Sequence, residues 1–164
     1  TCAFSVVAAK AGATTTSVDL SRNYLDWGRD NFRANNLDPA AHEFVFGDVF
    51  DWLRRFAKRG RTWDVVLLDP PTFSTTKRGR AFRAERDYAE LNALAMSLVA
   101  RGGWLFCSTN QRSLRADEFE VMLRDAAKRS GRVIEELEYR TVPLDFRVAP
   151  GERAYLKTLW ARLT

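Results

Sequence analysis

Apolar positions along the chain follow two patterns that alternate from segment to segment. Short runs rich in aliphatic or β-branched residues predict strands, and stretches with apolar positions three or four residues apart predict helices. The predicted strands cover residues 14–20, 43–46, 63–68, 104–109, 133–141 and 155–162. The predicted helices cover residues 2–11, 22–36, 50–56, 88–99 and 115–130. Strands that alternate with helices indicate an α/β fold built of right-handed βαβ units.

The segment WDVVLL, residues 63–68, is the most continuously apolar of these strands. Its weak polar alternation predicts a strand covered on both faces, as in a parallel sheet. The last two strands flank a Pro-containing loop and predict an antiparallel pair. The predicted fold is therefore a doubly wound, Rossmann-like, mostly parallel sheet with a C-terminal antiparallel strand pair, in a single domain over residues 1–164.

The composition narrows the class of protein. The 164 residues are 46% hydrophobic and 29% charged, as in soluble globular domains. No apolar stretch approaches the roughly 20 residues that span a bilayer, and the start does not resemble a signal peptide. Cys2 and Cys107 are too far apart in sequence for a metal motif or a disulfide framework. These features predict a cytoplasmic protein without a metal or a membrane partner.

The net charge is weaker evidence about the kind of partner. A net charge of +5 fits a nucleic-acid partner and a merely soluble surface about equally well. Basic residues cluster at 54–61, which we interpret as a solvated helix face, and at 77–86. The second cluster follows the motif DPPTF, so it is the better candidate for contact with phosphates.

Three aspartates directly follow predicted strands: Asp19, Asp48 and Asp69. In doubly wound sheets ligands bind beyond the carboxyl ends of the strands, so three acids there would face one crevice. An acid after the second strand can accept hydrogen bonds from ribose hydroxyls, and another can accept from the exocyclic amine of adenine. The alternative for each acid is that it caps a helix.

The residues after Asp69 are unusual. Pro70 and Pro71 have no N–H donor and a fixed φ, so the backbone leaves the strand ladder and stays extended. Phe73 then offers a flat ring at the strand tip, which suits a base removed from its stack. The alternative is a turn that only ends the strand.

These segments resemble motifs of class I S-adenosylmethionine-dependent methyltransferases that act on nucleic-acid bases. DPPTF resembles their motif IV, GATTTSVDLSRNYLDWGRDNF the acidic second motif, and GDVFDWL the adenine-contacting third motif. DPPTFSTTKRG and STNQR most resemble the C-terminal guanine-N7 methyltransferase domain of bifunctional ribosomal RNA large-subunit methyltransferases. The resemblance covers nearly the whole chain. It implies S-adenosyl-L-methionine as cofactor and ribosomal RNA as partner.

The resemblance also implies roles for individual residues. Asp19 would bind the ribose of the cofactor and Asp48 its adenine, which Val49 and Phe50 would flank. Asp69 and Asn110 would be catalytic. The full cofactor-binding set is Thr1, Asp19, Leu20, Ser21, Asp48, Val49, Phe50 and Asp69. The residues toward the RNA would be Pro70, Pro71, Phe73, Lys77, Arg78 and Arg112, the basic ones meeting phosphates.

Two base chemistries compete. A related branch methylates cytosine C5 through a cysteine that adds to the ring, seven residues after the glycine pair that precedes the fifth strand. Counted from Gly103, that position here is Asn110. Cys107 lies inside an apolar strand, which predicts a buried, inert thiol. Guanine N7 has an in-plane lone pair and needs no deprotonation, so we expect guanine-N7 transfer, with cytosine C5 as the alternative.

The chain departs from the family pattern at its start. Thr1 resembles the tail of the glycine-rich turn of motif I, so we expect the first strand, which would lie between those ending at Asp19 and Asp69, to be missing. We also expect an RNA-binding or second methyltransferase domain upstream in the parent polypeptide. Two further hypotheses remain: a non-catalytic RNA-binding domain with this fold, and an NAD-dependent Rossmann enzyme, against which DPPTF argues.

Overall fold

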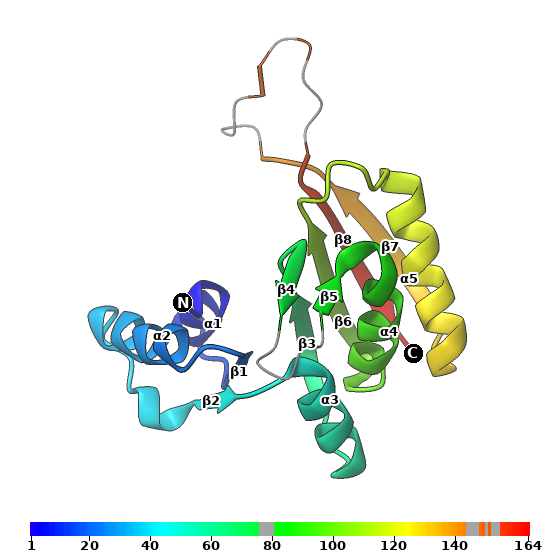
Figure 1. Cartoon of the computed structure of the whole chain (residues 1–164). Helices are drawn as coiled ribbons and strands as arrows, with labels where there is room; N and C mark the ends of the chain where they lie inside the picture. The colour runs from blue at the N-terminus through cyan, green and yellow to red at the C-terminus, as the bar shows by residue number, and fades with distance from the viewer. Residues whose placement is uncertain (76–80, 144–147, 150, 152–154) are drawn as a thin grey trace. The chain divides into compact units, whose positions relative to one another are not determined.

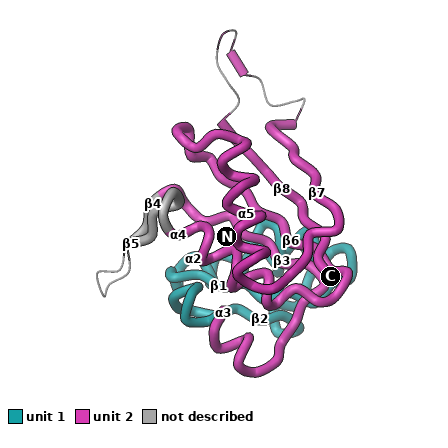
Figure 2. The backbone as a smooth tube through the Cα atoms, turned by 90° about the vertical axis from the view of Figure 1, so that its right-hand side faces the viewer, with its two compact units in different colours: residues 1–52 teal, residues 53–164 magenta. Residues whose placement is uncertain are grey.

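The structure is a computed structural model that describes residues 1–75, 81–143, 148–149, 151 and 155–164, with backbone alone at 73–75 and 81–86. The chain divides into two compact units, which we call unit 1 (residues 1–52) and unit 2 (residues 53–164), as Figure 2 shows. Each unit is described by itself.

Unit 1 pairs two parallel strands with flanking helices. Its elements are α1 (Ala3–Lys10), β1 (Thr16–Asp19), α2 (Arg22–Ala34), the 3-10 helix η1 (Pro39–Ala41) and β2 (Glu43–Phe46). Strands β1 and β2 run parallel, with Asp19 opposite Phe46 at their carboxyl ends. The fully buried Phe32 of α2 packs with Val6 and Ala9 of α1 to form the core of this unit.

Helix α2 begins where the sequence predicts. The hydroxyl of Ser21 accepts a hydrogen bond from the backbone N–H of Tyr24 at 3.3 Å, so Ser21 is the N-cap. Leu25, Gly28 and Phe32 form the buried face of the helix. At Gly28 an added Cβ would lie 2.5 Å from Cys2 Sγ, so a glycine lets the start of α1 approach α2 closely.

Unit 2 is built on a four-stranded sheet. Its elements are the rest of α3 (Val49–Lys58), β3 (Trp63–Leu68), β4 (Phe73–Thr75), β5 (Ala81–Arg83), α4 (Ala84–Met96), β6 (Val99–Thr109), α5 (Ala116–Ser130), β7 (Ile134–Arg140) and β8 (Lys157–Leu163). The strand order is β3-β6-β8-β7, and β4 and β5 form a separate antiparallel pair. Strand β3 is parallel to β6, whereas β8 is antiparallel to both of its neighbours. Strand β8 is therefore the one reversed strand of this sheet among the described residues.

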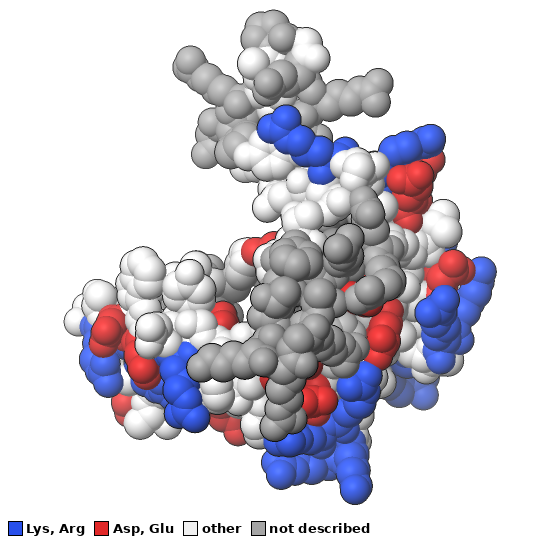
Figure 3. Space-filling view, viewed as in Figure 1, with Lys and Arg blue, Asp and Glu red and all other residues white. Residues whose placement is uncertain are grey.

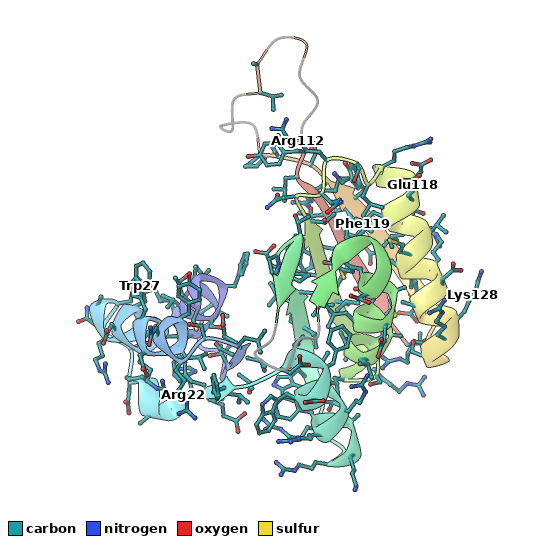
Figure 4. The ribbon with its side chains drawn as sticks, viewed as in Figure 1. Arg22, Trp27, Arg112, Glu118, Phe119 and Lys128 are labelled. Atoms are coloured by element: carbon teal, nitrogen blue, oxygen red, sulfur yellow. The ribbon has the colours of Figure 1, made fainter. Side chains whose placement is uncertain are left out.

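Two helices cover one face of this sheet. Helices α4 and α5 pack against each other there (Figure 1), and the rings of Tyr88 and Phe119 meet edge to face at 5.3 Å. In Figure 4 Phe119 points inward from α5 and Lys128 points away from it. The other face carries Phe106 and Trp160, whose ring centroids are 4.8 Å apart. An open hollow of about 340 Å³ on that face contains none of the predicted site residues; it is lined by Val65, Trp104, Glu138, Arg140 and Trp160.

The predicted elements agree with the structure in part. Strands 43–46 and 63–68 and the antiparallel C-terminal pair are confirmed. The prediction that β3 is covered on both faces is wrong, because Val65 and Leu67, which lie on the same face of this strand, are 43% and 40% exposed. The segment between the predicted strand 63–68 and the predicted helix 88–99, in which no strand was expected, contains β4 and β5.

Strand β6 also begins earlier than predicted. It starts at Val99, and the Gly102–Gly103 pair lies inside it, where the register with β3 shifts. At Gly103 an added Cβ would lie 2.6 Å from the backbone oxygen of Asp64, so the two strands come unusually close there. None of the helices in the described part of the chain is long and apolar enough to cross a membrane.

Candidate functional site

Asp19 and Asp48 follow two adjacent parallel strands of unit 1. The backbone N–H of Gly47 donates to the carbonyl of Asp19 at 3.0 Å, so the carboxyl ends of β1 and β2 are joined directly. Both acids are half-buried. The structure therefore brings the two predicted cofactor-binding acids to the same edge of the sheet.

In each of these acids, one carboxylate oxygen accepts hydrogen bonds from nearby backbone N–H groups. Asp19 Oδ1 accepts from the N–H of Ser21 at 2.7 Å, and Asp48 Oδ1 accepts from Phe50 at 2.9 Å and Asp51 at 3.3 Å. Asp48 thus caps the start of α3, as the helix-cap alternative supposed. These bonds use Oδ1 of each acid, and Oδ2 is the oxygen that would accept from a ligand.

The other predicted cofactor residues of unit 1 differ in exposure. Thr1 is exposed, and its carbonyl accepts a hydrogen bond from Asn31 Nδ2 at 2.9 Å. Leu20 is 41% exposed, and Val49 is half-buried. Phe50 is 2% exposed, so its ring lies in the interior and has little surface to offer a ligand.

In unit 2 Asp69 follows the last residue of β3. Pro70 and Pro71 lie outside the strand ladder, as predicted, and the Asp69 side chain is exposed. Its Oδ1 accepts a hydrogen bond from the hydroxyl of Ser108, on the neighbouring strand β6. Phe73 belongs to β4, and its side chain lies outside the described residues. Lys77 and Arg78 also lie outside them.

Asn110 follows β6 and is exposed, whereas its neighbours are anchored. The N–H of Gln111 donates to Thr109 Oγ1 at 3.2 Å. The ammonium group of Lys157, which is 5% exposed, donates to the carbonyls of Gln111 at 2.9 Å and Tyr155 at 2.7 Å. Burial lowers the pKa of Lys157. These contacts hold the backbone of the Asn110 segment against β8.

Arg112 lies two residues beyond Asn110. Its guanidinium carbon is 5.3 Å from the centre of the Tyr155 ring, a cation–π contact, and the side chain is exposed. Figure 4 shows Arg112 at the end of the sheet from which the β6–α5 connection leaves. The position leaves the charge accessible to an anionic partner.

Cys107 is buried as predicted. The side chain is fully inaccessible, and its Sγ donates to Asn92 Oδ1 at 3.1 Å. Burial raises the pKa of this thiol well above its usual range, so little thiolate forms. The side chain therefore lacks both the access and the ionisation that a covalent nucleophile needs.

Two groups behind Asp69 were not predicted from the sequence. The phenol of Tyr88 on α4 donates to the carbonyls of Ser108 at 2.6 Å and Leu68 at 3.3 Å. Burial is the main reason why the pKa of Tyr88 lies well above its usual range, so the phenol remains a donor. Tyr88 is the first residue of the predicted helix over residues 88–99, and its spacing from Leu91 is that of an apolar helix face. The one sequence signal was Ser108 itself, a polar residue at the end of an apolar strand.

The charged surface is uneven. Lys and Arg side chains gather over the C-terminal end of α3 (Figure 3), where Lys58 and Arg59 are exposed as predicted for a solvated face.

Across the described residues, no group of three or more His, Cys, Asp or Glu side chains is placed to hold a metal ion.

Comparison with known proteins adds the family context. The sequence profile of the S-adenosylmethionine-dependent methyltransferases matches residues 1–159. Ribosomal RNA large subunit methyltransferase K/L of Chromohalobacter salexigens is 41% identical over 147 residues, which cover 88% of this chain and 19% of the relative. The enzyme of that name from a Psychrobacter species is 43% identical over 122 residues, covering 72% and 15%. The chain thus spans less than a fifth of the length of these relatives.

A solved structure is also similar. It is a candidate methyltransferase crystallised in complex with SAH, and it superposes with a TM-score of 0.87 at 31% sequence identity. The similarity covers 99% of this chain and 42% of the solved chain. The predicted α/β fold with a mostly parallel sheet is confirmed by this match and by the strand pairing.

Proposed function

Because the chain belongs to the S-adenosylmethionine-dependent methyltransferase family, we propose that it transfers a methyl group to a base of large-subunit ribosomal RNA, at guanine N7. The named relatives support RNA as the substrate, since both are large-subunit ribosomal RNA methyltransferases. The observation that carries the proposal is the exposed Asp69, which follows β3 and is oriented from β6.

The residues of unit 1 fit the cofactor chemically. Two half-buried carboxylates stand at one sheet edge, and each has an oxygen that the capping bonds do not use. Such acceptors suit the hydroxyls of a ribose and the amine of an adenine. In this proposal Asp19 accepts from the ribose and Asp48 from the adenine of S-adenosylmethionine, which supplies a methyl group on a sulfonium.

Asp69 and Asn110 would act on the target base. The N7 lone pair forms the new bond to the methyl carbon as the carbon–sulfur bond breaks, and positive charge develops on the purine. The Asp69 carboxylate would stabilise that charge, because a fixed group of opposite charge costs little reorganisation during the reaction. The exposed amide of Asn110 would orient the base.

The state of Cys107 favours guanine N7 over cytosine C5. Methylation at C5 needs a thiolate to add to the ring, and the Cys107 thiol is buried with a raised pKa. Asn110 stands where the related branch carries its nucleophile and has no comparable reactivity. In the same proposal Arg112 meets RNA phosphates, together with Lys77 and Arg78, and Pro70, Pro71 and Phe73 contact the base.

The test is a labelled transfer assay. The intact protein is incubated with methyl-labelled S-adenosylmethionine and unmodified large-subunit ribosomal RNA, which is then digested to nucleosides and analysed by mass. We expect 7-methylguanosine, and roughly 100-fold less or lower still with the Asp69→Ala variant. Labelled 5-methylcytidine would show that the target is cytosine C5 and that the assignment to guanine N7 is wrong. An intact protein that binds RNA and incorporates no label would favour the non-catalytic alternative.

A further inference from the structure

A single buried phenol joins the ends of β3 and β6. Tyr88 is fully inaccessible, and its one hydroxyl proton is shared between the carbonyl of Ser108 on β6, at 2.6 Å, and that of Leu68, the last residue of β3, at 3.3 Å. The two strands are parallel, with Leu68 opposite Cys107. The phenol therefore holds the backbone on both sides of the point where the strands deliver Asp69 and Asn110.

Ser108 completes the connection to the carboxylate. Its side chain is 3% exposed, and its hydroxyl donates to Asp69 Oδ1. A hydroxyl has one proton, and the carbonyl of Leu68, at 3.4 Å, is its more distant acceptor, so the bond to Asp69 Oδ1 holds that oxygen of the exposed carboxylate beside Ser108. Because Ser108 is buried and Asp69 is exposed, the serine orients the acid without competing for the face that meets a substrate.

We propose that Ser108 and Tyr88 are positioning residues of the methyl-transfer site: Ser108 fixes the rotamer of Asp69, and Tyr88 fixes the backbone of Ser108 and Leu68. The inference rests on the proposed function, because it takes Asp69 as the group beside the reacting base. Neither residue touches the substrate. Both would act by aligning Asp69 in the transition state, so the loss of either should lower kcat.

This role predicts a kinetic pattern that loss of stability alone would not produce. Ser108→Ala removes the donor and leaves the β3–β6 ladder intact. We expect kcat to fall at least ten-fold, while KM for the RNA and the affinity for SAH change less than two-fold. Ser108→Thr keeps the hydroxyl in a residue that strands favour, so kcat should stay within about three-fold of wild type. Tyr88→Phe keeps the ring and should lower kcat three- to ten-fold.

The matched control is Ser97→Ala. Ser97 is exposed near the end of α4, and its hydroxyl donates to the carbonyl of Leu94 at 2.7 Å. This variant loses a serine hydroxyl from the same unit and should keep the wild-type kcat. A Ser108→Ala protein with wild-type kcat, or with a raised KM and unchanged kcat, would overturn the positioning role.

A crystal structure of the Ser108→Ala variant separates this inference from the proposed function. We expect the Asp69 carboxylate to leave the position that it holds beside residue 108. An unmoved carboxylate would overturn the inference even if the wild-type protein transfers methyl groups. If instead the wild type transfers none, the proposed function fails, and the position of Asp69 in the variant still decides whether Ser108 orients it. Should Ser108→Ala not fold, the same structure and kinetics with Tyr88→Phe decide.

Discussion

The two units hold their strand-end acids in different ways. In unit 1 Asp19 and Asp48 accept from backbone N–H groups only two or three residues away. In unit 2 Asp69 accepts from the hydroxyl of Ser108, 39 residues along the chain. The acids of unit 1 are thus oriented by the local turn into the next helix. The orientation of Asp69 depends on the packing of β3, β6 and α4.

This difference has a consequence for sensitivity to mutation. Local capping survives most changes elsewhere in the chain, because the partners are backbone groups of the same turn. The distance to a partner on another strand changes whenever the two strands shift relative to each other. We therefore expect unit 2 to show functional effects of distant substitutions more often than unit 1.

The largest expected effect separates the roles of the two kinds of acid. Asp69→Ala should lower methyl transfer by roughly 100-fold or more, with SAH affinity changed only a few-fold, since it removes a preorganised charge at the reacting centre. Asp19→Ala should instead weaken SAH binding by roughly ten-fold or more, because hydrogen bonds to a charged group are lost. Calorimetric titration and the labelled assay measure the two effects.

The control for these variants is Asp30→Ala. Asp30 forms an exposed ion pair with Arg33 on α2, which contributes little. If the phenotypes of Asp69→Ala and Asp19→Ala were exchanged, the assignment of binding to unit 1 and catalysis to unit 2 would be wrong.

A second prediction compares two glycines, one in each unit, at which an added Cβ would lie too close to a neighbouring residue. An alanine at Gly103 would meet the backbone oxygens of Asp64 at 2.6 Å and Ala100 at 3.0 Å, whereas an alanine at Gly28 would meet the side chain of Cys2. Backbone atoms in a sheet cannot move aside alone. Gly103→Ala should lower the free energy of unfolding by about 2–3 kcal/mol, and Gly28→Ala by about 1 kcal/mol or less. Urea denaturation measures both.

A double variant sharpens this comparison. Cys2→Ala removes the sulfur that Gly28→Ala would meet, so the pair should be less destabilised than the sum of the single changes. Purely additive free energies would contradict the contact between α1 and α2 as the cause.

A smaller effect should depend on pH. Burial lowers the pKa of Lys157 below its ordinary value of 10.5, so the unfolded chain binds this proton more tightly than the folded protein does. The penalty is present in full below the folded-state pKa and is relieved as pH rises toward 10.5. The free energy of unfolding of wild type should therefore rise with pH in that window, relative to the Lys157→Met variant.

Lys10→Met is the matched control for the loss of one positive charge, since Lys10 is exposed in unit 1. Equal pH slopes for wild type and Lys157→Met would show that the buried ammonium does not carry this linkage.

The smallest expected effect concerns the cysteines. Cys107→Ser should leave methyl transfer within a few-fold of wild type, because the thiol is buried behind the site and takes no part in it. Alkylation of the native protein with iodoacetamide should modify the half-buried Cys2 faster than Cys107. Complete loss of transfer in Cys107→Ser would revive the cytosine-C5 alternative.

The sequence was sufficient for features that depend on nearby residues. The start of the helix at residue 22, the strands at 43–46 and 63–68 and the strand-end placement of the three aspartates follow from local pattern. The early start of β6 could not be read, because Gly102 and Gly103 are typical of a turn and the irregular pairing with β3 lets them stay in the strand.

Features that need distant partners were missed. A tyrosine in an apolar helix face reads as a core residue, and the pattern does not show where its hydroxyl points. The contact of Tyr88 with two strand ends, and that of Ser108 with Asp69, exist only after β3, β6 and α4 have packed. The insertion of β8 between β6 and β7 was also unpredicted, since an edge position fits the same alternation of residues.

The position of β8 between β6 and β7 constrains the order in which the sheet of unit 2 can form during synthesis. Strands β6 and β7 are made first and leave a gap between them that only β8 fills, by pairing with both. Until residues 157–163 emerge from the exit tunnel, two strand edges facing each other lack partners, and such edges invite pairing with other chains. Pairing of β8 with β6 and β7 is therefore the step that completes this sheet, and Lys157, at the start of β8, anchors the Asn110 segment only once β8 is in place.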